Sequence, residues 1–396
     1  MKMKHRKIKI ITLCFAVAVF AAALSSAAFV PSTEAQAADN VKTADVYLIA
    51  GQSNAAGSTR VESTAYGYEL SYTPKENVLF YGGAHKTIQG SGGRYLTDFG
   101  PVRHGCGFTD KHVGFELGMA NILNEQPQYA GGGKKAVIFK SAAGGTSVFP
   151  DGNYGNFGNW YPKSLWKEDY YKTDYYNIAG FQYRTFMSVF EEFLERLSLQ
   201  GYEKVVIKGL FWMQGESDRG DPVEYERVCK VLFGDFRSDI SEITGEDYSD
   251  LPIYAGEISR TFGSADQASV EANLGLISAQ HRISQSMKNV YIAPLKDYLI
   301  NDIVNGKNTV LGSDSAHWNY EDIVSVGEEF MKIFGETYGE TQYFAEVVAT
   351  GSITAMSKCG VTFSGKYGPN YKAGTEKLRF TVNTVPEFTL KSIAAD

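Results

Sequence analysis

The chain of 396 residues has little cysteine and no excess of positive charge. Four cysteines are too few for a framework of disulfide bonds, so burial of apolar side chains must hold the core. Lysine and arginine together number 38 against 45 acidic residues. The resulting formal net charge of −7 argues against a nucleic acid partner. The chain has only six histidines, so each can be considered individually as a catalytic base or a metal ligand.

One uncharged apolar run stands out, and it lies near the amino terminus. A leader with several lysines and an arginine precedes the apolar stretch Ile10–Leu24, and the small residues of Ala35-Gln36-Ala37 follow. This pattern predicts a signal peptide over residues 1–37, cleavage before Ala38, and a secreted or cell-surface protein. The apolar stretch is shorter than a typical transmembrane helix. A retained N-terminal anchor is the alternative.

From about residue 44 to residue 337, strand-like and helix-like segments alternate. The strand-like segments are short apolar runs, as in strands buried on both faces of a parallel sheet: Asp45–Ala50, Lys135–Lys140, Lys204–Trp212, Pro252–Gly256 and Val290–Pro294. Apolar residues recur at intervals of three and four in the helix-like segments Phe186–Leu197, Leu274–Met287 and Glu321–Phe334. The alternation predicts a three-layer α/β/α domain over residues 38–340.

Two long segments interrupt this alternation. Residues 58–113 contain many glycines and tyrosines with little periodicity, and residues 144–180 are rich in aromatic side chains. We expect loops that shape a substrate surface over the strand ends, because long loops in a compact domain are usually functional. The alternative is that the aromatic rings only pack the loops onto the domain.

The sequence changes character at about residue 340. Residues 341–396 alternate in a β manner between glycine, proline and asparagine residues, which predicts a small β-rich segment. This tail loosely resembles bacterial cell-surface β-repeat modules and would be a partial module. The resemblance implies association with glycans or the cell wall.

Ser53 is the candidate nucleophile. The apolar run Val46–Ala50 ends at Gly51, and the serine follows two residues later. Open α/β sheets place their ligand sites at such carboxyl ends of strands. A serine in this position can also simply cap the following helix.

A serine hydroxyl becomes a good nucleophile when a histidine accepts its proton and a carboxylate orients that histidine. His317 follows the last strand, and Asp314 lies three residues before it in the same loop. His281 lies within a helical pattern and is interpreted as a surface or packing residue. A metal is not expected, since no further ligand with zinc-like spacing joins the cluster His104, Cys106 and His112.

Ester hydrolysis also needs hydrogen-bond donors for the oxyanion, and two other strand ends offer them. The segment Lys140–Thr146 contains the pair Gly144-Gly145, where backbone amides can approach a substrate closely. The segment Phe211–Asp218 places the side-chain amide of Gln214 directly after a strand. Taken singly, these segments also fit a tight turn and a helix N-terminus.

Together the four segments resemble the SGNH-hydrolase superfamily, in particular the branch of sialate O-acetylesterases and acetylxylan esterases. The resemblance covers roughly residues 44–337. It is carried by Gly51-Gln52-Ser53-Asn54, Gly144-Gly145-Thr146, Trp212-Met213-Gln214-Gly215-Glu216-Ser217-Asp218 and Asp314-x-x-His317. It implies a flavodoxin-like α/β/α fold with a parallel sheet, and a carboxylic ester hydrolase that needs no cofactor.

The resemblance also implies a role for each matching residue. Ser53 would be the nucleophile, His317 the general base and then acid, and Asp314 the carboxylate that orients His317. The oxyanion hole would consist of the Ser53 amide, the Gly145 amide in preference to that of Gly144, and the Gln214 side chain.

Three further side chains are assigned supporting roles. Gln52 and Asn54 would support the nucleophile turn. Glu216 would bind backbone amides or position the neighbouring glutamine, because a carboxylate beside an oxyanion opposes catalysis. Glu216 also remains an alternative to Asp314 as the group that orients the histidine.

The expected function is therefore that of an exported serine esterase that hydrolyses O-acetyl esters on a carbohydrate through an acyl-enzyme. Sialic acid, xylan or a related glycan would be the substrate. No nucleic acid partner is expected, and no membrane partner apart from the contact that the export signal makes. The 25 tyrosines suit stacking against sugar rings. The alternatives are a lipid or aryl esterase of the same fold, and an inert carbohydrate-binding surface protein.

Overall fold

The computed structural model describes ten segments of the chain. They comprise residues 41–61, 71–85, 93–150, 158–166, 179–264, 266–294, 316–338, 343–348, 361–363 and 377–382. The predicted signal peptide over residues 1–37 and the predicted triad residue Asp314 lie outside the described residues. So do two parts of the aromatic segment, residues 151–157 and 167–178.

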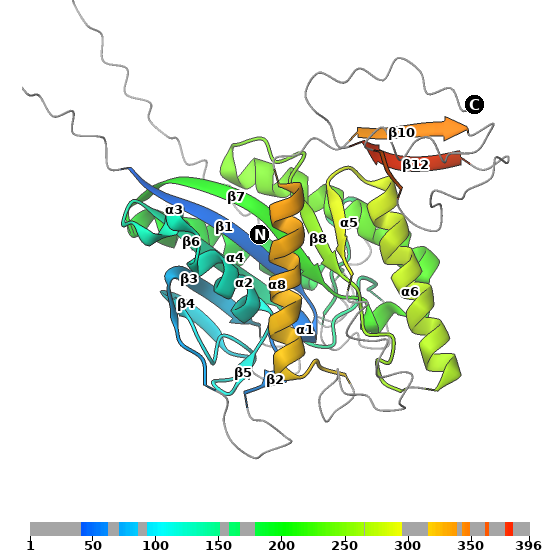
Figure 1. Ribbon diagram of the computed structural model, residues 1–396, viewed down its shortest axis with the longest axis horizontal. Helices are drawn as coiled ribbons and strands as arrows, with labels where there is room; N and C mark the ends of the chain where they lie inside the picture. Colours follow the sequence, from blue (N-terminus) through cyan, green and yellow to red (C-terminus); the bar gives the residue numbers. More distant parts are fainter. Residues whose placement is uncertain are drawn as a thin grey trace, which may run out of the picture. The chain divides into compact units, whose positions relative to one another are not determined.

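A seven-stranded sheet with the strand order β4-β3-β6-β1-β7-β8-β9 forms the centre of the molecule (Figure 1). The strands are β1 (Lys42–Gly51), β3 (Lys75–Ala84), β4 (Tyr95–Val102), β6 (Lys134–Ala142), β7 (Tyr202–Met213), β8 (Ile253–Gly256) and β9 (Val290–Ala293). All neighbouring strands are parallel except β3 and β4, which are antiparallel. The five strands expected from the sequence are therefore present, and the mostly parallel sheet is confirmed.

Helices cover both faces of the sheet and give three layers (Figure 1). Residues Tyr47 and Ile49 of β1 belong to one buried cluster, and Val46, Leu48 and Ala50 belong to the other. The first cluster includes residues of α2 (Glu116–Asn124), α3 (Pro127–Ala130) and α8 (Tyr320–Thr337). The second includes residues of α4 (Phe181–Leu199), α5 (Pro222–Thr244) and α6 (Gln267–Ser286). Successive residues of β1 thus face opposite helical layers, as a strand of period two requires.

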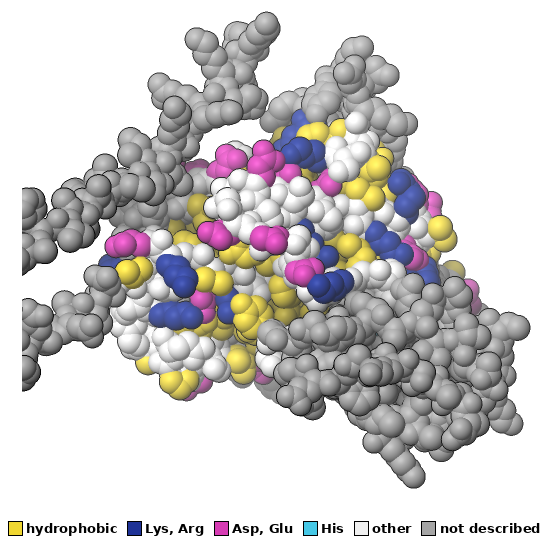
Figure 2. Space-filling view, turned by 90° about the horizontal axis from the view of Figure 1, so that it is seen from above, with side chains coloured by type: hydrophobic (Ala, Val, Ile, Leu, Met, Phe, Trp, Pro, Cys, Tyr) yellow, Lys and Arg dark blue, Asp and Glu magenta, His cyan; other side chains and the backbone are white. Residues whose placement is uncertain are grey.

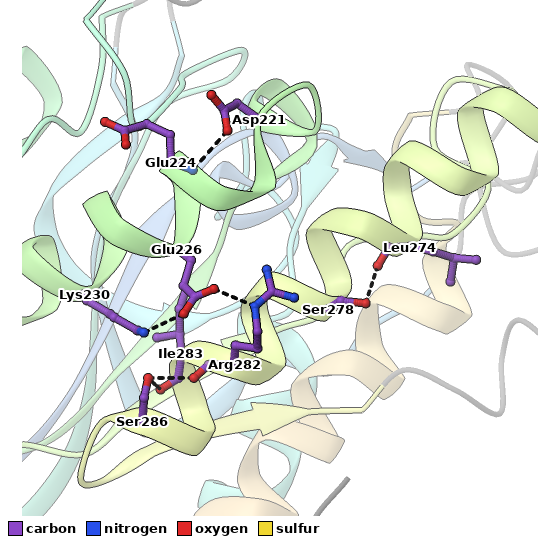
Figure 3. A network of polar contacts seen from close by, with 9 residues as sticks. All are labelled: Asp221, Glu224, Glu226, Lys230, Leu274, Ser278, Arg282, Ile283 and Ser286. Carbon is purple, nitrogen blue, oxygen red and sulfur yellow. Dashed lines mark hydrogen bonds and ion pairs between the residues drawn. The ribbon is translucent and has the colours of Figure 1, made fainter. Parts of the chain in front are cut away.

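Local sequence signals fix where the helices begin. The Asp221 carboxylate accepts a hydrogen bond of 3.0 Å from the Glu224 N–H, which caps α5 (Figure 3). Pro222 occupies the first turn, where its missing N–H costs nothing.

Glu226 of α5 contacts Lys230 of the same helix and Arg282 of α6, each at 2.6 Å (Figure 3). These partly exposed pairs contribute little stability but keep the surface of the two helices polar.

The expectation that residues 58–113 form a loop without secondary structure was wrong. This segment contains β3 and β4 at the edge of the sheet, and the short strands β2 (Thr59–Arg60) and β5 (His112–Val113) pair with each other. Gly82 and Gly83 of β3 have φ values of 105° and 140°, and a Cβ on Gly82 would lie 2.0 Å from the Lys140 carbonyl oxygen. Because close packing demands glycine here, the apolar run of the strand is confined to Val78–Tyr81 and ends before the strand does.

The aromatic segment is partly a packing element. Trp160 is completely buried and packs edge-to-face against Trp212, with 5.2 Å between the ring centroids. Its Nε1–H donates to the Thr146 hydroxyl at 2.9 Å. For Trp160 the packing alternative therefore holds, and this ring does not shape a substrate surface.

The C-terminal segment contains a three-stranded antiparallel sheet in the order β10-β12-β11, with β10 (Tyr343–Val348), β11 (Val361–Phe363) and β12 (Lys377–Val382). Its β character agrees with the sequence, and its likeness to surface repeats stays a prediction.

On the face drawn in Figure 2, acidic and basic side chains are interspersed. Among the helices that the structure describes, none combines the length and hydropathy needed to cross a bilayer.

Candidate active site

Ser53 follows the central strand of the sheet and lies between the ends of both neighbouring strands. The Gln52 N–H donates to the Met213 carbonyl at 2.9 Å, and the Ala143 N–H donates to the Gly51 carbonyl at 3.2 Å. Gly51 has φ 137°, and a Cβ there would lie 2.0 Å from the Met213 carbonyl oxygen, so only glycine fits. Ser53 begins the single helical turn α1 (Ser53–Ala56) and is partly exposed.

The turn after β6, residues 143–148, lies next to the serine. A Cβ built on Gly144 would lie 3.7 Å from the Ser53 Cβ. Gly145 has φ 72°, in the left-handed region that favours glycine, and the Thr146 hydroxyl closes the turn on the Ala143 carbonyl at 2.8 Å. The N–H groups of Ser53 and Gly145 have no acceptor among the described residues. Both remain candidate donors to a substrate oxygen.

The segment that carries His317 is attached to the serine turn. The Asn54 side chain donates to the Ala316 carbonyl and accepts from the Trp318 N–H, each at 3.4 Å, so it contacts the backbone on both sides of the histidine. The Thr59 hydroxyl adds a bond of 2.8 Å to the Trp318 carbonyl. The structure thus brings the segments of the predicted nucleophile and the predicted base together.

Glu216 lies in the interior between these two segments. Its Oε1 accepts a hydrogen bond of 2.8 Å from Asn54 Nδ2, whereas its buried Oε2 has no hydrogen-bond partner in the described part of the chain. Burial raises the pKa of Glu216, and its own backbone N–H, Asn54 and the charge of His317 act in the opposite direction. The charge of His317 therefore acts on the carboxyl group of Glu216. Glu216 therefore remains an alternative to Asp314.

Gln52 supports the loop after β7. Its Oε1 accepts from the Gly215 N–H at 3.2 Å and from the Ser217 N–H at 3.4 Å. The side chain thereby connects the nucleophile turn to the segment Glu216–Asp218, a short 3-10 turn.

The side chain of Gln214 is directed toward the turn after β6. Its Nε2 donates to the Thr146 carbonyl at 3.2 Å and to Asp218 Oδ2, so both amide hydrogens have acceptors. Its Oε1 is buried and has no hydrogen-bond partner among the described residues. The sequence assigned Gln214 to the oxyanion hole. In this conformation the side chain joins two loops, and donation to an oxyanion requires the exchange of one of these bonds.

Asp218 is a buried residue of the site to which sequence reasoning gave no role. Its two carboxylate oxygens accept from the Val148 N–H at 3.2 and 3.1 Å, and one of them also accepts from Gln214. Burial raises its pKa to about 7. The only signal in the sequence was its place at the end of the Trp-x-Gln-Gly-Glu-Ser-Asp motif.

Three of the other histidines contact hydroxyl or carboxylate groups of their own surroundings. His104 Nε2 is 2.9 Å from the Tyr320 hydroxyl, His112 Nδ1 is 2.5 Å from the Thr109 hydroxyl, and His281 Nε2 is 2.5 Å from Glu257 Oε1. Within the described segments, no three histidine, cysteine or acidic side chains are grouped in a way that could hold a metal ion.

Comparisons with known proteins identify a family for the chain. The family model described as carbohydrate esterase, sialic acid-specific acetylesterase matches residues 43–336. A comparison with curated sequences found no match.

Among solved structures, a protein from Arabidopsis thaliana has 17% identity and a TM-score of 0.47, covering 74% of this chain and 98% of its own. NanS has 14% identity and a TM-score of 0.47, with 75% and 98% covered. A carbohydrate acetylesterase from Xanthomonas citri has 15% identity and a TM-score of 0.41, with 86% and 73% covered.

Proposed function

The chain belongs to the carbohydrate esterase family of sialic acid-specific acetylesterases and is an acetyl-ester hydrolase, and we propose that it works through an acyl-enzyme on Ser53. The observation that carries this proposal is the convergence of four segments on one serine. The ends of β6 and β7 are each hydrogen-bonded to the end of β1 beside Ser53, and Asn54 attaches the His317 segment to them.

In the proposed reaction, His317 accepts the proton of the Ser53 hydroxyl while the oxygen attacks the acetyl carbonyl carbon. The carbonyl π electrons move to the oxygen, and the N–H groups of Ser53 and Gly145 bind the resulting oxyanion. When the tetrahedral intermediate collapses, the C–O bond to the sugar breaks and His317 protonates the departing sugar oxygen. A water molecule then hydrolyses the acetyl ester of Ser53 by the same steps, releasing acetate.

We assign the orientation of His317 to Asp314, which precedes it by three residues. Glu216 is the second candidate, because its Oε2 is buried without a hydrogen-bond partner among the described residues and its pKa responds to the histidine. The carboxylate would hold the imidazole in the tautomer that accepts the serine proton and would stabilise the imidazolium that forms.

The proposed substrate is an O-acetyl ester on a carbohydrate such as sialic acid or xylan, and the proposed location is outside the cytoplasm. The family description supports a sugar substrate. The amino-terminal pattern of residues 1–37 supports export.

The test replaces Ser53 with alanine and measures acetate release from acetylated sialic acid, acetylated xylan and a chromogenic acetate. Ser53→Ala and His317→Ala are each expected to lower kcat at least about 10³-fold, because the nucleophile and base act as a unit. Ser58→Ala, five residues along the same segment, is the matched control and should keep wild-type turnover. Wild-type turnover in Ser53→Ala would refute the nucleophile assignment. Mass spectrometry of acid-quenched enzyme should find an acetyl group on the peptide that contains Ser53.

A further inference from the structure

Two hydrogen-bonded connections join the turn after β6 to the loop after β7, and both involve one carboxylate. The Val148 N–H donates directly to Asp218 at 3.2 and 3.1 Å. Gln214 Nε2 donates both to the Thr146 carbonyl, at 3.2 Å, and to Asp218. The turn that contains Gly145 is therefore attached at Thr146 and Val148, one and three residues further along the chain.

We propose that Asp218 is the positioning residue of the oxyanion hole, holding the turn of Gly145 beside Ser53 through Val148 and Gln214. This inference rests on the proposed function, since it assumes that the Gly145 amide binds the oxyanion. Asp218 would not touch the substrate. Its effect would be to fix the distance between two donors that belong to different strands, and a misplacement of about 1 Å in such a site costs on the order of 10² in rate.

The electrostatics of the site indicate that this carboxylate is retained at a cost to stability. Burial raises the pKa of Asp218 to about 7, the bonds from Gln214 and Val148 lower it, and the charge of Glu216 raises it. The other titratable groups that interact with it in the described part of the chain are Tyr225 and Cys229 of α5, and burial raises the pKa of both well above the ordinary value. These two groups are neutral at pH 7 and supply no positive charge to the carboxylate.

The sign of the stability effect follows from the two pKa values. The pKa of Asp218 is about 7 in the folded protein and near 3.8 in the unfolded chain, so the native state binds this proton more tightly. The contribution of Asp218 to the free energy of unfolding therefore decreases as the pH rises from about 4 to about 7, and stays low above that. A buried carboxylate that destabilises the fold where it is charged is characteristic of a functional site.

The pH dependence of catalysis should have the opposite direction. A protonated Asp218 is a weaker acceptor for Val148 and Gln214, so the turn would be held less firmly below about pH 7. The general base also has to lose its proton before it can act. Wild-type kcat/KM should therefore fall with decreasing pH more steeply than a single ionisation allows.

Asp218→Asn is the decisive variant because it preserves shape and removes the charge. The single amide oxygen of asparagine is a weaker acceptor than a carboxylate and has to accept from both the Val148 N–H and Gln214 Nε2, while the new Nδ2 group adds a competing donor beside Val148. Both connections are therefore weakened. We expect kcat to fall on the order of 10²-fold, with KM changed less than about threefold. The fall of kcat/KM toward acid pH should follow one ionisation in this variant. The midpoint of thermal unfolding at pH 8 should not fall below that of the wild type.

Asp221→Asn is the matched control. Asp221 lies three residues further along, is exposed and caps α5 through the Glu224 N–H (Figure 3). Asparagine caps helices as well as aspartate does, so kinetics and stability should equal those of the wild type.

Three outcomes would overturn the inference. They are wild-type kcat in Asp218→Asn, a loss of kcat together with a lower unfolding midpoint at pH 8, and a wild-type acid limb that follows a single ionisation. The last measurement needs no variant and stands even if Asp218→Asn does not fold. An active Ser53→Ala would refute the proposed function itself, whereas an inactive Ser53→Ala beside a fully active Asp218→Asn would refute only the role of Asp218.

Discussion

Replacing Lys140 with methionine would remove the cation from an ion pair that solvent does not reach. Lys140 lies on β6, three residues before the turn at Ala143, and its Nζ is 2.9 Å from Oε2 of Glu116 at the start of α2. Neither side chain has any exposed surface. Glu116 Oε1 accepts a further bond of 2.8 Å from the Gly114 N–H.

Two large electrostatic contributions nearly cancel in the intact pair. At 2.9 Å and an effective dielectric constant of about 20, the attraction is roughly 6 kcal/mol. Removing each ion from water costs several kcal/mol, so the net contribution of the pair is small. Lys140→Met cancels the attraction but leaves the Glu116 carboxylate buried. We therefore expect the free energy of unfolding to fall by about 3–5 kcal/mol.

The double variant Lys140→Met/Glu116→Gln removes both charges and keeps an acceptor for the Gly114 N–H. It should be more stable than Lys140→Met and within about 2 kcal/mol of the wild type, because no unpaired charge remains. Urea unfolding of the wild type, the two single variants and the double variant at one pH completes the cycle. The reasoning would be refuted if Lys140→Met lost less than about 1 kcal/mol, or if the losses in the two single variants simply added in the double variant.

Two further predictions concern the site directly. Gly145→Ala forces an alanine into a left-handed conformation, so the free energy of unfolding should fall by about 1–2 kcal/mol and kcat should fall with it. Gly144→Ala meets only an ordinary contact of 3.7 Å and should unfold in urea like the wild type, while its methyl group beside the nucleophile raises KM. Asp314→Asn should lower kcat on the order of 10⁴-fold, and Glu216→Gln should lower it less. The opposite ranking in steady-state kinetics would assign the orienting role to Glu216.

The sequence was sufficient to predict the strands that are buried on both faces. Runs such as Val46–Ala50 and Val290–Ala293 contain little except apolar residues, since helices cover both sides of them. The strand β3, which lies between β4 and β6, was missed because its end, Gly82 and Gly83, is shaped by close backbone packing against these two neighbours. Such packing depends on residues distant in sequence and leaves no periodic pattern.

Only those residues of the candidate site that directly follow a strand could be predicted from the sequence. Ser53, Gly145 and Gln214 each lie just after a strand, and parallel strands bring their carboxyl ends to one edge of the sheet. The contact between Asp218 and Val148 joins residues 70 positions apart. The direction of the Gln214 amide likewise depends on an acceptor in another loop. No local pattern contains that information, because side-chain orientation is decided by tertiary packing.

The position of the serine at the middle of the sheet determines how the active site is lost on heating. β1 is paired with β6 on one side and β7 on the other, and bonds at Gly51 and Gln52 continue this pairing up to the serine itself. Local opening occurs where a segment has few buried contacts, whereas a central strand separates from its neighbours only in global unfolding. The lifetime of the serine in its place is then the lifetime of the whole sheet. Loss of activity at temperatures below the cooperative melting of the sheet would therefore arise in the loops that carry Gly145 and His317, and not at the serine.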